Sequence, residues 1–261
     1  MALYIVPVPI GNLKDITLRA IDVLNSVDII IVEDTRYSLK LLNHLGIKKK
    51  LYSYYKPKEK EKAEHIIKLL ADKNGALITD SGTPLISDPG HILIRKAIEK
   101  GIEIESLPGP TAFVPALTNS GLMADTFIFA GFSPKKGGKL KEYLRQFSEM
   151  RFTMIFYESP RRVEKFLETA FEIFGNRDFS ISKELTKKNE KIIRGELKDH
   201  KKLLDDIKVL GEFVIVIDGY RGNERRDKPE LNSVEDIFDY FKSRYGISKN
   251  AIKKVLMTRE K

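Results

Sequence analysis

Short apolar runs alternate with amphipathic stretches along the first 118 residues of the chain. The run Ile29–Val32 suits a buried strand. The stretch from Thr17 to Ser26 has apolar residues at helical spacing, and Thr17 suits the N-cap of that helix. A second helix is expected to open at Pro110-Thr111. Because strands that alternate with helices are typical of a parallel sheet, the pattern predicts an α/β domain over residues 1–118.

A second alternation of this kind extends from residue 119 to residue 222. Polar residues at 119–125 indicate a connector between the two domains. Strands are expected near residues 126–130, 152–157, 179–183, 191–195 and 212–217, and helices at 140–149, 161–174 and 198–207. Short paired strands around Asn189 predict that this sheet is mixed. Residues 219–230 indicate a linker, and residues 230–261 a small tail of two short helices.

Four predicted strands of the first domain end in loops rich in proline, glycine or acidic residues. The loop from Asp80 to Gly90 carries two carboxylates, three hydroxyls and a glycine in its first half. In a parallel sheet such loops meet at the carboxyl edge, where ligands bind. This loop has neither the lysine of a triphosphate site nor a Gly-x-Gly-x-x-Gly turn. Its groups suit a ribose and an amino-acid-like ligand, although each loop taken alone is more commonly turn chemistry.

The charge of the chain indicates what kind of partner it binds. The chain has 46 lysine and arginine residues against 37 acids, a formal net charge of +9, which favours nucleic acid. Lysines cluster at residues 48–50, 56–62, 135–141 and 249–254, and three of these clusters flank loops beside strand ends. There is no cysteine, and the four histidines are scattered, so no metal site is predicted.

Targeting features are not evident along the chain. No apolar run approaches the ~20 residues that a membrane span needs. The N-terminus enters a strand by Leu3, without the basic region and cleavage site of a signal peptide. Together with the lack of cysteine, this fits a cytoplasmic protein that has no membrane partner.

The strand-end loops and several motifs of the second domain resemble a known family. The motifs are Pro9-Ile-Gly-Asn-Leu13, Glu33-Asp-Thr-Arg36, Asp80-Ser-Gly-Thr-Pro84, Ser87-Asp-Pro-Gly90, Leu107-Pro-Gly-Pro110, Gly131-Phe132 with Pro134, Tyr157-Glu-Ser-Pro160 with Arg162, and Lys183-Glu-Leu-Thr-Lys187. In this order, over nearly the whole chain, they are similar to those of the tetrapyrrole methylase superfamily, the class III methyltransferases that use S-adenosylmethionine (SAM). The closer resemblance is to the ribosomal RNA small subunit methyltransferase I branch, which 2'-O-methylates a cytidine of 16S ribosomal RNA.

The resemblance implies a fold, a cofactor and partners. It implies two α/β domains of tetrapyrrole-methylase type with a SAM cleft between them, and a small C-terminal helical tail. It also implies SAM as the cofactor, the 16S ribosomal RNA of the small ribosomal subunit as the substrate, and a homodimer. The implied cofactor-binding residues are Pro9, Gly11, Asp80, Ser81, Gly82, Thr83, Ser87, Pro108, Gly109, Pro110, Thr111 and Tyr157.

The same resemblance suggests residues for catalysis and for RNA. Glu33 or Asp34, helped by Lys183 and Glu184, are the candidates for handling the proton of the acceptor hydroxyl. The candidates for RNA binding are Arg36, Lys56, Lys135, Lys136 and Lys139. The family usually has an arginine where Ser182 or Lys183 stands, so an arginine contact to phosphate is either missing here or replaced by a lysine contact.

Two other functions remain open at this point. A SAM enzyme that acts on a uroporphyrin or precorrin would also favour a basic cleft, because such substrates carry many carboxylates. A non-catalytic RNA- or ribosome-binding protein on the same scaffold predicts a degraded SAM site, whereas all four loops are intact. Single motifs also have plain structural interpretations: Glu33–Arg36 as an ion pair at a capped helix, Lys183-Glu184 as an exposed ion pair, and Tyr157 as a core aromatic.

Overall fold

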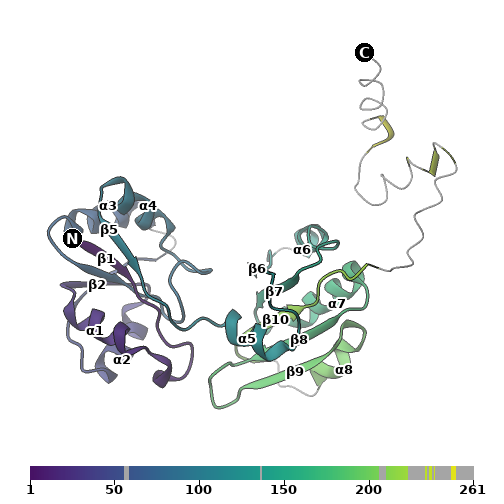
Figure 1. Cartoon of the computed structure of the whole chain (residues 1–261), viewed down its shortest axis with the longest axis horizontal. Coiled ribbons are helices and arrows are strands. Elements are labelled where there is room, and N and C mark those ends of the chain that lie inside the picture. The colour runs from purple at the N-terminus through teal and green to yellow at the C-terminus, as the bar shows by residue number, and fades with distance from the viewer. Residues whose placement is uncertain are drawn as a thin grey trace. The chain divides into compact units, whose positions relative to one another are not determined.

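The computed structural model describes residues 1–55, 59–135, 137–205 and 210–222, and beyond these only Ser233, Glu235, Asp236, Phe238 and residues 248–250 (Figure 1). The first half of the chain contains β1 (Ala2–Ile5), the 3₁₀ turn η1 (Leu13–Asp15), α1 (Leu18–Ser26), β2 (Ile29–Val32), α2 (Thr35–His44), β3 (Lys50–Ser53), α3 (Glu59–Leu70), β4 (Gly75–Leu77), α4 (His91–Glu99) and β5 (Glu103–Ser106).

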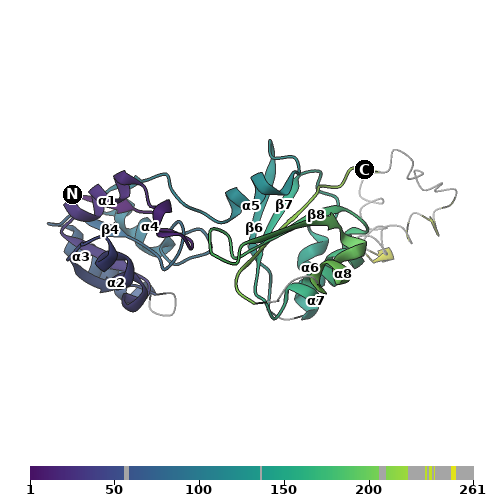
Figure 2. The ribbon, with the colours of Figure 1, turned by 90° about the horizontal axis from the view of Figure 1, so that it is seen from below.

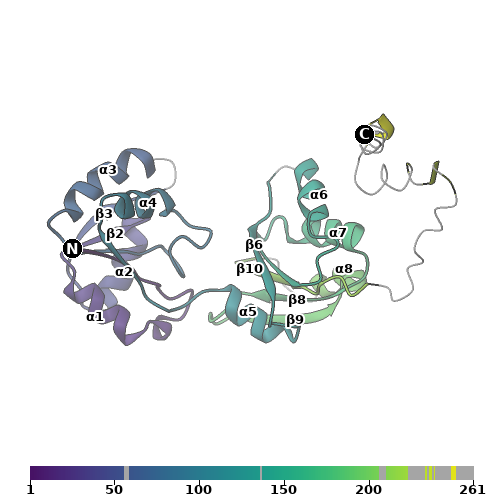
Figure 3. The same ribbon diagram turned by 45° about the horizontal axis from the view of Figure 1, so that its top comes forward.

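The first sheet has the strand order β3-β2-β4-β1-β5, and all of its pairs are parallel, which confirms the predicted parallel sheet. Helices α1 and α2 pack on one face and α3 and α4 on the other (Figure 3). All four residues of β2 are buried, because helices cover both of its faces. Parallel pairing brings the carboxyl ends of β1, β2, β4 and β5 to the same edge of the sheet.

Helix α1 begins where the sequence predicts. The Thr17 side chain accepts a hydrogen bond from the Ala20 backbone N–H at 3.0 Å, which confirms it as the N-cap. The expected helix at Pro110-Thr111 begins slightly later, at Phe113.

The second half of the chain contains α5 (Phe113–Ser120), β6 (Phe127–Phe132), α6 (Gly137–Arg145), β7 (Thr153–Glu158), α7 (Val163–Phe174), β8 (Asp178–Lys183), β9 (Lys191–Glu196), the 3₁₀ turn η3 (Leu197–Asp199), α8 (His200–Asp205) and β10 (Phe213–Ile217). The strand order is β6-β7-β10-β8-β9. Only the β6–β7 pair is parallel, so the predicted mixed sheet is confirmed. Helix α5 covers one face of this sheet, and α6, α7 and α8 cover the other (Figure 2).

Helix α5 packs against the second sheet, not the first. Its residues Ala116 and Leu117 share a core cluster with Ile155 of β7 and with Val214 and Val216 of β10. The division expected at residue 118 therefore falls inside this helix, and the expected connector at 119–125 begins with its last turn. The chain passes from one sheet to the other in residues 107–112, between β5 and α5.

Residues Met1–Tyr220 form one compact unit, distinct from Arg221–Lys261. The helical tail predicted at residues 230–261 lies outside the described residues apart from the few positions named above. Among these, Lys249 Nζ lies 2.5 Å from Glu235 Oε1 and 4.9 Å from the ring centroid of Phe238. In the described part of the chain, no helix is both long and apolar enough to cross a membrane.

Candidate cofactor-binding site

Three loops at the carboxyl edge of the first sheet are hydrogen-bonded to one another. Val8, after β1, and Gly82, after β4, exchange two backbone hydrogen bonds of 2.9 and 3.0 Å. Thr83 donates from Oγ1 to the carbonyl of Pro110, after β5, at 2.8 Å. Gly109 lies so close to Pro7 that an added Cβ would stand 2.6 Å from the proline ring. The loops that the sequence singles out therefore form one platform.

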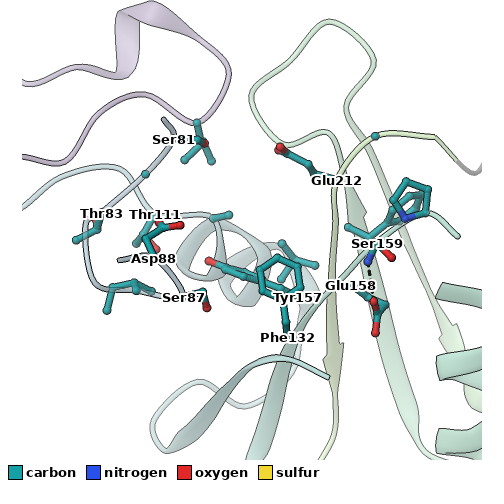
Figure 4. A pocket seen from close by; sticks show the side chains of 18 residues that line it. Ser81, Thr83, Ser87, Asp88, Thr111, Phe132, Tyr157, Glu158, Ser159 and Glu212 are labelled. Carbon is teal, nitrogen blue, oxygen red and sulfur yellow. Dashed lines mark hydrogen bonds between the residues drawn. The ribbon is translucent and has the colours of Figure 1, made fainter. Parts of the chain in front are cut away.

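A cavity of about 290 Å³ opens beside this platform (Figure 4). Residues of both sheets line it: Ile10, Ser81, Gly82, Thr83, Ile86, Ser87, Asp88, Thr111, Ala112, Phe132, Tyr157, Glu158, Ser159, Pro160, Gly211, Glu212, Phe213 and Val214. Six of the twelve expected cofactor-binding residues are among them: Ser81, Gly82, Thr83, Ser87, Thr111 and Tyr157. A small cavity with an apolar wall and a rim of hydroxyls is typical of a small-ligand site.

The other six expected residues lie around this cavity without lining it. Gly109 and Pro110 line a second hollow of about 400 Å³, which shares Ile10 and Thr111 with the first. Gly11 packs against the loop after β8, where Thr186 Oγ1 accepts the backbone N–H of Asn12 at 3.0 Å. The remaining three are Pro9, Asp80 and Pro108.

The loop after β4 holds an unusual backbone conformation at the cavity. Leu85 and Ser87 have φ of 71° and 70°, although neither is glycine, and Gly82 has φ of 82°. Positive φ is costly for residues with a Cβ and is found where the surrounding structure enforces it, often at ligand sites. The positive φ angles of Leu85 and Ser87 are therefore consistent with a loop that binds a ligand.

Aromatic side chains of the second sheet form the opposite wall. The Phe132 and Tyr157 rings meet edge to face, with centroids 5.4 Å apart, and the Phe129 ring centroid lies 4.9 Å from that of Tyr157. Burial raises the pKa of the Tyr157 hydroxyl, which contacts Thr111 in the loop between β5 and α5. Tyr157 therefore links this wall to the loop after β5.

A buried ion pair anchors the same wall. The Glu158 side chain, only 1% exposed, accepts from Arg162 Nε and Nη2 at 2.7 and 2.6 Å. Ser133 donates its hydroxyl to Glu158 at 2.5 Å, and its carbonyl accepts from Arg162 Nη2 at 2.9 Å. The backbone N–H of Ser159 donates to Glu158 as well. This network fixes the ends of β6 and β7, and with them the residues that face the cavity.

Three carboxylates of the cavity lining were not among the twelve expected cofactor-binding residues: Asp88, Glu158 and Glu212. Glu158 pairs with Arg162, and Glu212 with Lys187 at 3.0 Å. Asp88 belongs to the Ser87-Asp-Pro-Gly90 motif, which was a signal for it, but an acid before proline is also ordinary turn chemistry. Among the described lining residues there is no lysine, arginine or histidine.

Asp80 and Asp34 link the loops after β4 and β2. Asp80 Oδ1 accepts the backbone N–H of Asp34 at 3.1 Å, and Asp34 caps α2. Desolvation raises the pKa of Asp80, and the Asp34 charge adds to this rise. Hydrogen bonds from the Arg36 side chain and backbone lower the pKa of Asp34 to about 2. The Arg36 side chain is 83% exposed, so it can meet a phosphate while it pairs with Asp34.

Lys183 and Glu184 end β8 in different surroundings. Lys183 is buried and lies opposite Phe213 in the sheet. Burial alone would raise the pKa of Glu184, but Lys187, at 3.0 Å, and the backbone N–H of Glu212 hold it below its usual range. Of the expected RNA-binding residues, Lys135 and Lys139 are exposed, and Lys56 and Lys136 lie outside the described residues.

The fold and its loops define a class. The chain belongs to the tetrapyrrole (corrin/porphyrin) methylase family, whose model matches residues 2–201. The crystal structure of uroporphyrin-III-C-methyltransferase from Thermus thermophilus has the same fold, with a TM-score of 0.60 at 18% identity, over 83% of this chain and 94% of that chain.

Within this family, the chain belongs to the ribosomal RNA small subunit methyltransferase I group. The Vibrio cholerae protein of that name is 43% identical over 232 residues, which cover 87% of this chain and 81% of the relative. The one from Halalkalibacterium halodurans is 39% identical over 264 residues, which cover 98% of this chain and 90% of the relative. The resemblance predicted from the motifs is confirmed.

Proposed function

We propose that this chain is a SAM-dependent methyltransferase that methylates the ribose 2'-hydroxyl of a cytidine in the 16S ribosomal RNA of the small ribosomal subunit. The relatives that carry the ribosomal RNA methyltransferase name match most of the chain, including the loops that build the cavity. The observation that carries the assignment of SAM to this cavity is its lining, which combines an apolar wall, hydroxyls and carboxylates.

The lining fits SAM better than the alternatives. The ligand's adenine suits the apolar side chains of Ile10, Tyr157 and Val214, and its ribose and amino-acid end suit the hydroxyls of Ser81 and Thr111. SAM supplies an activated methyl group on a cationic sulfonium. No lysine, arginine or histidine stands among the described lining residues, which disfavours a polyphosphate.

A group other than SAM must accept the proton of the acceptor hydroxyl, because a ribose alcohol is a poor nucleophile at neutral pH. None of the four candidates lines the cavity, so the proposed group must act on the hydroxyl of a ribose that is held at the cavity mouth beside the methyl group. A carboxyl with a lowered pKa is a weak base, which disfavours Asp34 and Glu184. We therefore propose that Glu33 accepts the proton of the hydroxyl and that Lys183 stabilises the developing oxyanion.

The RNA would be held by the exposed cations beside the strand ends. Arg36, Lys135 and Lys139 are the described members of the proposed set, and Lys56 and Lys136 complete it. A ribosomal substrate also implies a cytoplasmic protein. The homodimer that the family resemblance implies is part of the proposal, and light scattering of the purified protein would test it.

The function is tested by incubating the purified chain with SAM labelled in its methyl group and with small ribosomal subunits that lack the modification. Label is expected in 16S ribosomal RNA, and nuclease digestion is expected to release 2'-O-methylcytidine. Label on the cytosine ring, or on an added uroporphyrin but not on RNA, would contradict the proposal.

Replacing Asp88 by asparagine is expected to weaken SAM binding by about 1.5–3 kcal/mol, because a carboxylate that faces the cavity is lost. Titration calorimetry measures the change. Asp80→Asn is the matched control, since asparagine can still accept the Asp34 N–H and hold the loop that Asp80 ties. A much smaller loss is expected for it. Equal losses for both variants would mean that SAM reaches Asp80 as well.

A further inference from the structure

Phe132 is an exposed aromatic side chain at a binding cavity. It ends β6, lines the cavity and is 58% exposed, whereas its neighbour Tyr157 is half-buried. The two rings meet edge to face at 67° (Figure 4). One exposed apolar residue is common on protein surfaces. Phe132, however, lies between the proposed cofactor cavity and solvent, so a ligand that arrives from solvent can contact its ring.

The backbone on both sides of Phe132 is held in place. The β6–β7 register shifts between Phe129 and Gly131, and Gly131 has φ of 63°, so the strand is re-aimed just before Phe132. Ser133, the next residue, is buried and hydrogen-bonded to both Glu158 and Arg162. The ring is thus presented on a rigid support, which lowers the entropy that a stacking partner must overcome.

Cations follow Phe132 closely in the chain. Lys135 and Lys139 are exposed, and α6, which includes Lys139, begins five residues after the ring. An aromatic platform beside cations that can meet the backbone phosphates is the pattern by which proteins hold single-stranded RNA. Tyr157 already provides the inner aromatic wall, so Phe132 is available to a base that enters from solvent.

We infer that Phe132 is the platform on which the target cytosine ring stacks when the RNA strand enters the site. Stacking there would hold the attached ribose at the cavity mouth, close to the methyl group. This inference rests on the proposed function and names the residue that positions the base. Lys135 and Lys139 hold the flanking phosphates.

The test compares Phe132→Ala, Phe132→Leu and Phe132→Tyr with the full-length wild type. Loss of the ring is expected to weaken binding of small ribosomal subunits by about 10- to 100-fold, since a base–aromatic stack is lost. Leucine keeps an apolar side chain but no π-face and is expected to behave like alanine. Tyrosine keeps the ring and is expected to restore most of the affinity. SAM affinity, measured by calorimetry without RNA, is expected to fall by a smaller factor than the affinity for small ribosomal subunits, because Phe132 is 58% exposed and Tyr157 forms the inner part of the cavity wall.

Lys139→Ala is the matched control for electrostatics. It is expected to weaken RNA binding and to reduce the slope of log affinity against log salt by about one unit. Phe132→Ala is expected to weaken binding at every salt concentration with an unchanged slope. Stacking and phosphate contact are thereby separated in one titration series.

Three results would overturn the inference. If wild type methylates the subunits and Phe132→Ala binds and methylates them equally well, no base stacks on this ring. If Phe132→Ala weakens SAM instead of RNA, the ring belongs to the cofactor wall. If wild type itself leaves small subunits unmethylated, the proposed function fails and the inference fails with it.

Discussion

Replacing Arg162 by alanine is expected to lower the free energy of unfolding by about 3–5 kcal/mol, because a buried carboxylate loses its charged partner. Glu158 has almost no access to water and, among the described residues, would keep only the Ser133 hydroxyl and the Ser159 N–H as donors. Urea denaturation followed by circular dichroism measures the change. Since the same network fixes Phe132 and Tyr157, SAM affinity is expected to fall as well.

Arg161 offers a matched control for this prediction. It is the neighbouring arginine and is exposed, whereas the Arg162 side chain is 26% exposed. Arg161→Ala is expected to change the stability by no more than about 0.5 kcal/mol. Arg162→Lys keeps the charge but loses the two-pronged contact with Glu158, and an intermediate loss is expected. Similar stabilities for Arg161→Ala and Arg162→Ala would show that the buried carboxylate is satisfied without the guanidinium.

Replacing Glu33 by glutamine, or Lys183 by methionine, is expected to slow methyl transfer by about 10²- to 10⁴-fold, because each removes a group proposed to handle the proton. Single-turnover rates with saturating SAM and small ribosomal subunits isolate this step. Asp34→Asn and Glu184→Gln are expected to have smaller effects, since both carboxylates are engaged by neighbouring cations, which lower their pKa.

Comparison of these four variants identifies the group that accepts the proton. SAM affinity should be nearly unchanged in each, because none of the four side chains lines the cavity. Rates within a few-fold of wild type for Glu33→Gln and Lys183→Met would place the proton acceptor elsewhere. A larger loss for Asp34→Asn than for Glu33→Gln would mean that RNA displaces Arg36 from Asp34 and frees its carboxylate.

The sequence alone supported the two sheets and the platform of loops, because these depend on local patterns. Buried runs such as Ile29–Val32, the Thr17 cap and the turns at Gly82 and Gly109 each reflect a requirement of a few neighbouring residues. The resemblance to a methyltransferase family rested on these same segments. The mixed character of the second sheet was predicted from the short paired strands around Asn189, whereas the order of the strands is known only from the structure.

The placement of α5 could not be predicted in the same way. Its apolar residues would suit either sheet, and only the packing of Ala116 and Leu117 against Ile155 and Val214 assigns the helix to the second one. Helix patterns report which face is buried, and they do not report against what.

The sequence by itself determined the class of protein and the loops that carry its site. Only the tertiary structure decided which side chains face the cavity. Asp88 lines it and Asp80 does not, although both belong to one loop, because Asp80 turns to the backbone of Asp34. Phe132 became a candidate for the same reason: its exposure depends on a bulge and on contacts of Ser133 with residues about 25 to 30 positions away. Charge and polarity are properties of single residues, whereas orientation depends on contacts between residues distant in the chain.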